Sequence, residues 1–144
     1  MEVTLTQGAI GKMMNGEVTS DKEMIPVLQV TELKPILTKT NHQEMWRMLL
    51  SDGTHLLRGV VLSSTLTTSV KQGFLQTGYI VRLTQFICQT IRALRIVLVL
   101  NLEVISTESN IIRHGVLGPN PNDTQDYGEV LKEAVFDKMK DLEV

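Results

Sequence analysis

The chain has 144 residues, of which 42% are hydrophobic and 21% are charged, and its formal net charge is −2. This length and composition predict one globular domain with its own core and exclude wholesale disorder. The bulk charge excludes a chain that binds nucleic acid by overall basicity. The charge is uneven, because residues 1–112 carry ten Lys/Arg and nine Asp/Glu, whereas residues 113–144 carry four and seven.

Few residues suggest covalent or metal chemistry. Cys88 is the only cysteine, so no internal disulfide or cysteine-based metal site is expected, and we interpret Cys88 as a small buried strand residue. His42, His55 and His114 lack the spacing of a metal site or a catalytic triad, and no phosphate-binding glycine loop occurs. We therefore expect a protein that is not an enzyme and needs no cofactor. With no signal sequence and no long apolar run, we expect an intracellular soluble protein.

The first segment with a regular pattern is Leu5–Met14, whose apolar residues recur at helical spacing. Thr6 is the expected N-cap and Gly16 the expected stop. Because the segment also contains two glycines, we predict a short helix that plugs one end of a barrel.

A β-type run follows at Ile25–Leu37. We expect Pro26 at the start of this strand and Pro35 at the end of its regular pairing. We expect residues 38–44 to form a polar loop that leads into the next strand.

Two apolar runs, Met45–Leu50 and Leu56–Leu62, flank the sequence Ser51-Asp52-Gly53-Thr54. Asp-Gly between such runs is a strong hairpin signal, because Gly accepts positive φ and Asp can bond nearby amides. Alternation predicts that Trp46 points into the core and that Arg47 lies on a wall open to solvent.

The second half of the chain predicts a further helix and a second hairpin. Residues 63–73 predict a short helix, and Tyr79–Ile91 and Arg95–Ile105 predict a second hairpin whose last strand is buried on both faces for part of its length. Five strands, a helix between the third and fourth strands and a helical plug predict an all-β oligonucleotide/oligosaccharide-binding (OB) barrel. A small sandwich and an SH3-like barrel are the alternatives.

The last part of the chain differs in composition. Residues 113–128 are rich in Gly, Pro, Asn and Asp and predict a linker. Glu129–Leu142 predicts an amphipathic acidic helix, with an apolar stripe at Leu131, Val135, Met139 and Leu142. We therefore divide the chain into a barrel, residues 1–121, and a linker with an acidic tail, residues 122–144.

Several short motifs then suggest a family. In order, GAI, PVLQV, Lys34-Pro35, LLSDG, QFIC, VLNLEVI and LGPNP resemble the N-terminal domain of the large, 70 kDa DNA-binding subunit of replication protein A. The resemblance covers about residues 5–121. It implies an OB barrel whose basic cleft binds acidic amphipathic helices of replication and DNA-damage-response proteins, with weak binding of single-stranded DNA. It also implies a place in the nucleus and a role in DNA replication and repair.

When the family's cleft residues are carried onto the matching positions of this sequence, the resemblance implies which residues supply the cations of the cleft and which form its floor. The cations are Lys34, Arg47, Arg92 and Arg95. Met45 replaces a basic residue of the family, and Arg58 replaces a small polar residue and partly compensates. The floor comprises small, polar and apolar residues: Gly59, Val61, Ser64, Ile87, Gln89, Ile91, Ile96 and Leu98.

Other interpretations remain open. Longer members of the family continue into further barrels and a zinc ribbon that a single cysteine cannot build, so this chain could be a truncated, inactive paralogue. It could equally be a stand-alone single-stranded DNA-binding protein, although few aromatics are available for stacking. The cations could also be scattered solubilising charges. The tail either docks as a pseudo-ligand in its own cleft or a neighbour's, or remains a solvated helix.

Overall fold

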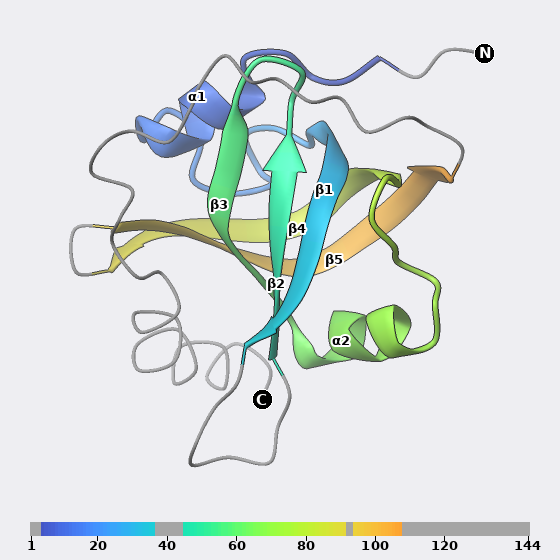
Figure 1. Cartoon of the computed structure of the whole chain (residues 1–144). Helices are drawn as coiled ribbons and strands as arrows, with labels where there is room; N and C mark the ends of the chain where they lie inside the picture. Colours follow the sequence, from blue (N-terminus) through green and yellow to red (C-terminus); the bar gives the residue numbers. More distant parts are fainter. Residues whose placement is uncertain (1–3, 37–44, 92–93, 108–144) are drawn as a thin grey trace.

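Five strands close into a barrel in the order β1-β2-β3-β5-β4 (Figure 1). The computed structural model describes residues 4–36, 45–91 and 94–107. Neighbouring strands are antiparallel except for β3 and β5, which are parallel. This confirms the predicted five-stranded OB barrel. The elements are α1 (Ala9–Met14), β1 (Val27–Ile36), β2 (Met45–Ser51), β3 (Leu56–Leu62), α2 (Ser64–Lys71), β4 (Ile80–Ile91) and β5 (Leu94–Ser106).

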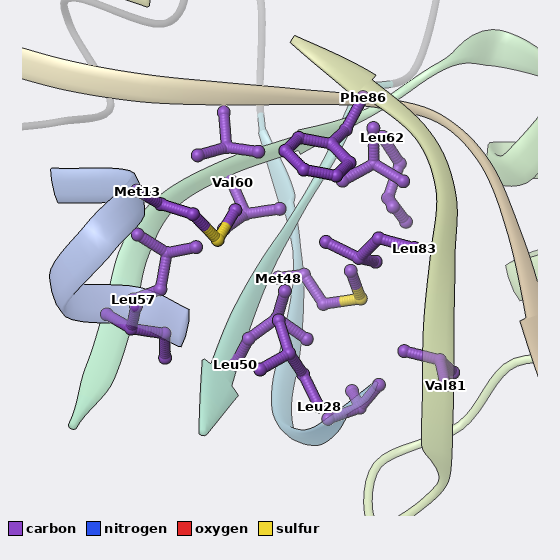
Figure 2. Close-up of a cluster of buried hydrophobic side chains, with 14 of the residues drawn as sticks. Met13, Leu28, Met48, Leu50, Leu57, Val60, Leu62, Val81, Leu83 and Phe86 are labelled. Atoms are coloured by element: carbon purple, nitrogen blue, oxygen red, sulfur yellow. The ribbon is translucent and has the colours of Figure 1, made fainter. Parts of the chain in front are cut away.

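Apolar side chains from all five strands fill the barrel (Figure 2). Alternate residues point inward along most of each strand, as the pleat of a β-strand requires, and the alternation shifts where the register is irregular, as between Leu83 and Phe86. Helix α1 adds Ala9, Ile10 and Met13 to this core and so acts as the predicted plug. Fully buried members drawn in Figure 2 include Met13, Leu28, Met48, Leu50, Leu57, Val60, Leu62, Val81, Leu83 and Phe86.

The turn between β2 and β3 is fixed by the side chain of Asp52. Its Oδ1 accepts hydrogen bonds from the backbone amides of Thr54 (2.8 Å) and His55 (2.7 Å), and its Oδ2 accepts one from Ile10 (3.1 Å). Gly53 takes the positive φ of 95° that the turn needs. Asp52 is thus the predicted turn residue, and it also ties the hairpin to α1.

Helix α1 starts later than predicted. Thr6 is not its N-cap, because the Thr6 hydroxyl instead accepts a hydrogen bond from Val27 N (2.9 Å) and Thr6 N donates to Val27 O (2.9 Å). The N-cap is Gly8, which has no side chain for capping. The end was predicted correctly, since Asn15 is the C-cap and Gly16 has a φ of 89°.

Pro35 does not end the pairing of β1. It lies opposite Trp46 of β2, and the strand continues to Ile36. A proline is tolerated here because β4 pairs with β1 only at Val27–Gln29, so the other edge of β1 at Pro35 is not in a ladder. Trp46 packs against the core but is only partly buried.

The remaining predicted elements of the barrel are present. Helix α2 lies between β3 and β4. The hydroxyl oxygen of its N-cap, Ser63, accepts a hydrogen bond from the backbone N–H of Leu66, with an N–O distance of 3.4 Å. Strands β4 and β5 form the second hairpin, and Ile96–Val99 are buried on both faces. The predicted linker and tail lie outside the described residues. Within the part of the chain that the structure describes, no helix is long and apolar enough to cross a membrane.

Candidate functional site

The strand register aligns one residue from each strand in a continuous line around the outside of the barrel. Lys34 pairs with Arg47, Arg47 with Val61, Val61 with Leu98, and Leu98 with Ile87. Their sequence neighbours belong to the core cluster (Met48, Val60, Val97 and Phe86) or pack against it (Leu33), so these five residues face away from the core. We call Lys34, Arg47, Val61, Leu98 and Ile87 the outer row.

The outer row is basic at one end and apolar at the other. Its cations come from β1 and β2, and its apolar side chains come from β3, β5 and β4. The predicted floor residues Ile96 and Gln89 lie beside it as a register pair of β5 and β4. Such a face offers charge and apolar contact together, which a flat solubilising surface does not.

The apolar part of this face is covered. Val61, Leu98 and Ile96 have no exposed surface, although none belongs to the barrel's core cluster. Ile87 and Gln89 are half-buried. The other predicted floor positions vary, since Gly59 is buried, Ile91 is half-buried, and Ser64 is exposed as the first residue of α2.

The cations of the row differ in their surroundings. Lys34 is exposed, and its Nζ lies 2.7 Å from a carboxylate oxygen of Glu32, two residues away on the same strand face. Arg47 is half-buried opposite Lys34. Arg58, on β3, is half-buried as well. Glu32 therefore offsets part of the Lys34 charge.

Arg95 is engaged in a structural role. Its guanidinium donates hydrogen bonds to the backbone oxygens of Met13 (2.9 Å) and Val18 (3.4 Å) and to the hydroxyl of Thr90 (3.3 Å). It therefore joins the C-terminal end of α1 to the β4–β5 hairpin. Arg92, predicted as a further cleft cation, lies outside the described residues, as do the tail residues Leu131, Val135, Met139 and Leu142.

A cavity of about 460 Å³ adjoins the β4 end of the outer row. The segment Thr19–Lys22 forms one wall, and Ile87, Gln89 and Leu100 line the other side. This segment lies between α1 and β1. Its placement depends on non-local bonds, because Cys88 N donates to Thr19 O (2.8 Å) and Phe86 N donates to the Asp21 carboxylate (3.0 Å).

No aromatic side chain belongs to the outer row. Phe86 lies in the core, Trp46 packs against it, and Tyr79 is half-buried. Phe74 is 66% exposed, but it follows α2 rather than lying on the row. The row thus lacks the rings on which nucleic-acid bases stack.

The described residues also gather little catalytic chemistry. His55 lies in the β2–β3 turn, where its ring nitrogen is 3.1 Å from the Thr54 hydroxyl. In residues 4–36, 45–91 and 94–107, no three His, Cys, Asp or Glu side chains gather closely enough to hold a metal ion.

Comparison with known proteins identifies the family of this barrel. A family model described as "Replication factor-A protein 1, N-terminal domain" matches residues 5–107. The chain belongs to this family. The match begins just before α1 and ends one residue beyond β5, so it covers the whole barrel.

Individual relatives agree with the family match. The chain is 54% identical over 124 residues to one replication protein A 70 kDa DNA-binding subunit of Arabidopsis thaliana, which is 85% of this chain and 16% of that protein. It is 48% identical over 116 residues to another 70 kDa DNA-binding subunit from the same plant, covering 78% of this chain and 14% of the relative. The corresponding Mus musculus protein is 33% identical over 108 residues, covering 74% and 17%. The chain thus spans 14–17% of the length of these relatives.

Proposed function

We propose that this replication protein A-type domain is a recruitment module of DNA replication and repair. It binds acidic amphipathic helices of replication and DNA-damage-response proteins along the outer row, and it holds single-stranded DNA only weakly. Its place of action is the nucleus. The single observation that carries this proposal is the line of cations and apolar side chains that the register builds across all five strands.

An acidic amphipathic helix matches both ends of this line. Such a helix places an apolar stripe against an apolar surface while its carboxylates approach cations at the rim. Val61, Ile87 and Leu98 would receive the stripe, and Arg47 with Lys34 would receive the carboxylates. The relatives are named as replication proteins, which supports a role in replication. The presence of cations and apolar side chains on one face supports an acidic amphipathic helix as the partner.

Tight DNA binding is a weaker match. Stacking contributes about 1–3 kcal/mol per base, and the outer row has no ring to provide it. The few cations can contact phosphates, but that binding falls steeply as salt is added. The alternative, a stand-alone single-stranded DNA-binding protein, would therefore need contacts that this row does not offer.

A fluorescence-anisotropy titration of the full chain tests the proposal. A labelled acidic amphipathic peptide and labelled oligo(dT) are titrated in parallel at physiological salt. We expect micromolar binding of the peptide and far weaker binding of oligo(dT). The double change Lys34→Glu and Arg47→Glu should weaken peptide binding at least about tenfold, equivalent to about 1.4 kcal/mol.

Arg82→Glu is the control, because Arg82 lies at the opposite end of the barrel wall, 3.7 Å from Glu103. It changes the same kind of charge away from the row and should leave peptide binding within about twofold, as expected for a distant surface charge. If Arg82→Glu weakened peptide binding as much as the double change does, the loss would reflect the net charge of the protein and not the outer row. Submicromolar oligo(dT) binding with no peptide binding would instead favour the stand-alone DNA-binding function.

A further inference from the structure

Part of the outer face of the barrel is buried although it lies outside the core cluster. Outward residues in the second half of β5, such as Asn101 and Glu103, are exposed, as expected of a sheet face in contact with water. Ile96 and Leu98 face outward in the first half of the same strand, and Val61 faces outward beside them, yet none has exposed surface. Apolar side chains that lie outside the core need atoms above the sheet to exclude water from them.

We propose that the segment Glu129–Leu142 of the same chain occupies this face and masks it from partners. This inference rests on the proposed function, because it names the regulation of the same binding site. The segment would cover Val61, Ile96 and Leu98 as a partner helix would, and a partner would have to displace it.

The chemistry of the segment matches that of the outer row. Helical spacing places Leu131, Val135, Met139 and Leu142 on one stripe, wide enough to cover the apolar end of the row. Acidic residues accompany the stripe, and residues 113–144 carry a net charge of −3 against +1 for residues 1–112. The segment itself has four acidic residues and three lysines, a net charge of −1, so its acidic side chains can approach Arg47 and Lys34 and its apolar stripe contributes most of the match.

The chain between the barrel and the segment is long enough. Strand β5 ends at Ser106, which leaves the 22 residues 107–128 as a tether. A flexible chain of this length has a root-mean-square span of about 26 Å. Leu98 lies eight residues back along β5, a distance of about 26 Å at 3.3 Å per residue. The tether thus reaches the row without being stretched.

Tethering makes a weak contact effective. A short flexible linker gives an effective concentration in the millimolar range. A segment with an intrinsic dissociation constant near 0.1 mM would then occupy the row about nine-tenths of the time and weaken a competing peptide about tenfold. Recruitment would become dependent on a ligand that outcompetes the segment or on a change that releases it.

The test uses the full chain with methyl-labelled Ile, Leu and Val, and two double variants with matched charge. Val135→Asn with Met139→Asn disrupts the stripe and leaves the net charge unchanged. Asp137→Asn with Lys140→Asn is the control, because it also leaves the net charge unchanged and leaves the stripe intact. NMR then measures the line broadening of each methyl group by a soluble gadolinium chelate.

We expect the methyl groups of Val61, Ile96 and Leu98 to be protected in the wild type and in the control. In the stripe variant they should become accessible to the chelate, while the neighbouring core methyls of Val60 and Val97 stay protected. The stripe variant should also bind the acidic peptide about tenfold more tightly than the wild type.

The outcomes separate this inference from the proposed function. Equal protection of Val61, Ile96 and Leu98 in all three proteins would overturn the masking, whatever the peptide does. Protection that is lost on dilution would assign the cover to a second copy of the chain and would overturn masking by its own segment. Release of the three methyls without any peptide binding would support the masking and contradict the proposed function.

Discussion

At the scale of single residues, the carboxylate of Asp52 illustrates how one side chain fixes both a turn and a helix. Burial alone would raise the pKa of Asp52, but hydrogen bonds from His55, Thr54 and Ile10 stabilise the ionised form and hold the pKa below its ordinary value. The ionised carboxylate therefore adds stability above the unfolded-state pKa of about 3.9, and this contribution is lost as the pH falls through the lower folded-state pKa.

We predict that Asp52→Asn lowers the free energy of unfolding at pH 7 by about 1–3 kcal/mol, because buried amides lose a charged acceptor. The difference from the wild type should shrink as the pH falls below about 4. Urea denaturation across pH measures this, with Glu103→Gln as an exposed control that should show little effect. A difference that stays constant into strong acid would contradict this role of the charge.

Cys88 is a second residue whose environment defines its behaviour. Burial raises the pKa of the Cys88 thiol to about 11, and nearby Arg95 lowers it while Glu23 raises it further. At pH 8 only about one thiol in a thousand is then ionised. We predict that Cys88 reacts slowly with an aromatic disulfide reagent in the folded protein and rapidly in denaturant. Equally fast reaction in both states would contradict its burial in the core.

At the scale of elements, Arg95 connects the end of α1 to the β4–β5 hairpin. Its bonds to the carbonyls of Met13 and Val18 satisfy acceptors at and beyond the end of a six-residue helix. A helix this short is not stable by itself and depends on such tertiary contacts.

We predict that Arg95→Ala lowers the free energy of unfolding by about 1–3 kcal/mol, the range for losing bonds to a charged donor. Hydrogen exchange should speed up in residues 9–18 more than in β1–β3. Arg82→Ala is the matched control, because the ion pair of Arg82 with Glu103 is exposed and should contribute less than about 1 kcal/mol. Equal effects of the two variants would show that Arg95 is an ordinary surface cation.

At the scale of the whole molecule, local patterns were enough to predict the barrel. Apolar runs of β type marked the strands, the Asp52-Gly53 pair marked the first hairpin, and residues 63–73 were predicted to form the helix that is α2. These features are encoded by neighbours in sequence, through pleat, turn and helix periodicity. The order of these elements favoured the OB barrel over a small sandwich and an SH3-like barrel, and the closed five-stranded barrel confirms that prediction.

The errors arose where a residue's partner is distant in sequence. Thr6 was expected to cap α1, but it pairs with Val27 at the start of β1. Pro35 was expected to end a ladder, but only one edge of β1 is paired there. No pattern within a short window contains such information.

In the candidate site, too, some features were predicted from the sequence and others depend on partners distant in sequence. Lys34, Arg47 and Val61 were expected on one face, and the register aligns them. That Arg95 is committed to Met13, 82 residues away, could not be predicted from spacing. The role of Thr19–Lys22 as a cavity wall likewise depends on bonds to β4.

Binding of an acidic amphipathic helix by the outer row can be observed residue by residue. Methyl NMR of the full chain, carrying Val135→Asn and Met139→Asn, follows each methyl resonance during titration with such a peptide. We predict that the resonances of Val61, Ile87, Ile96 and Leu98 shift together, while those of the core residues Val60, Val97 and Val99 move little. Shifts confined to another face of the barrel, or no shifts at saturating peptide, would show that the outer row is not the binding site.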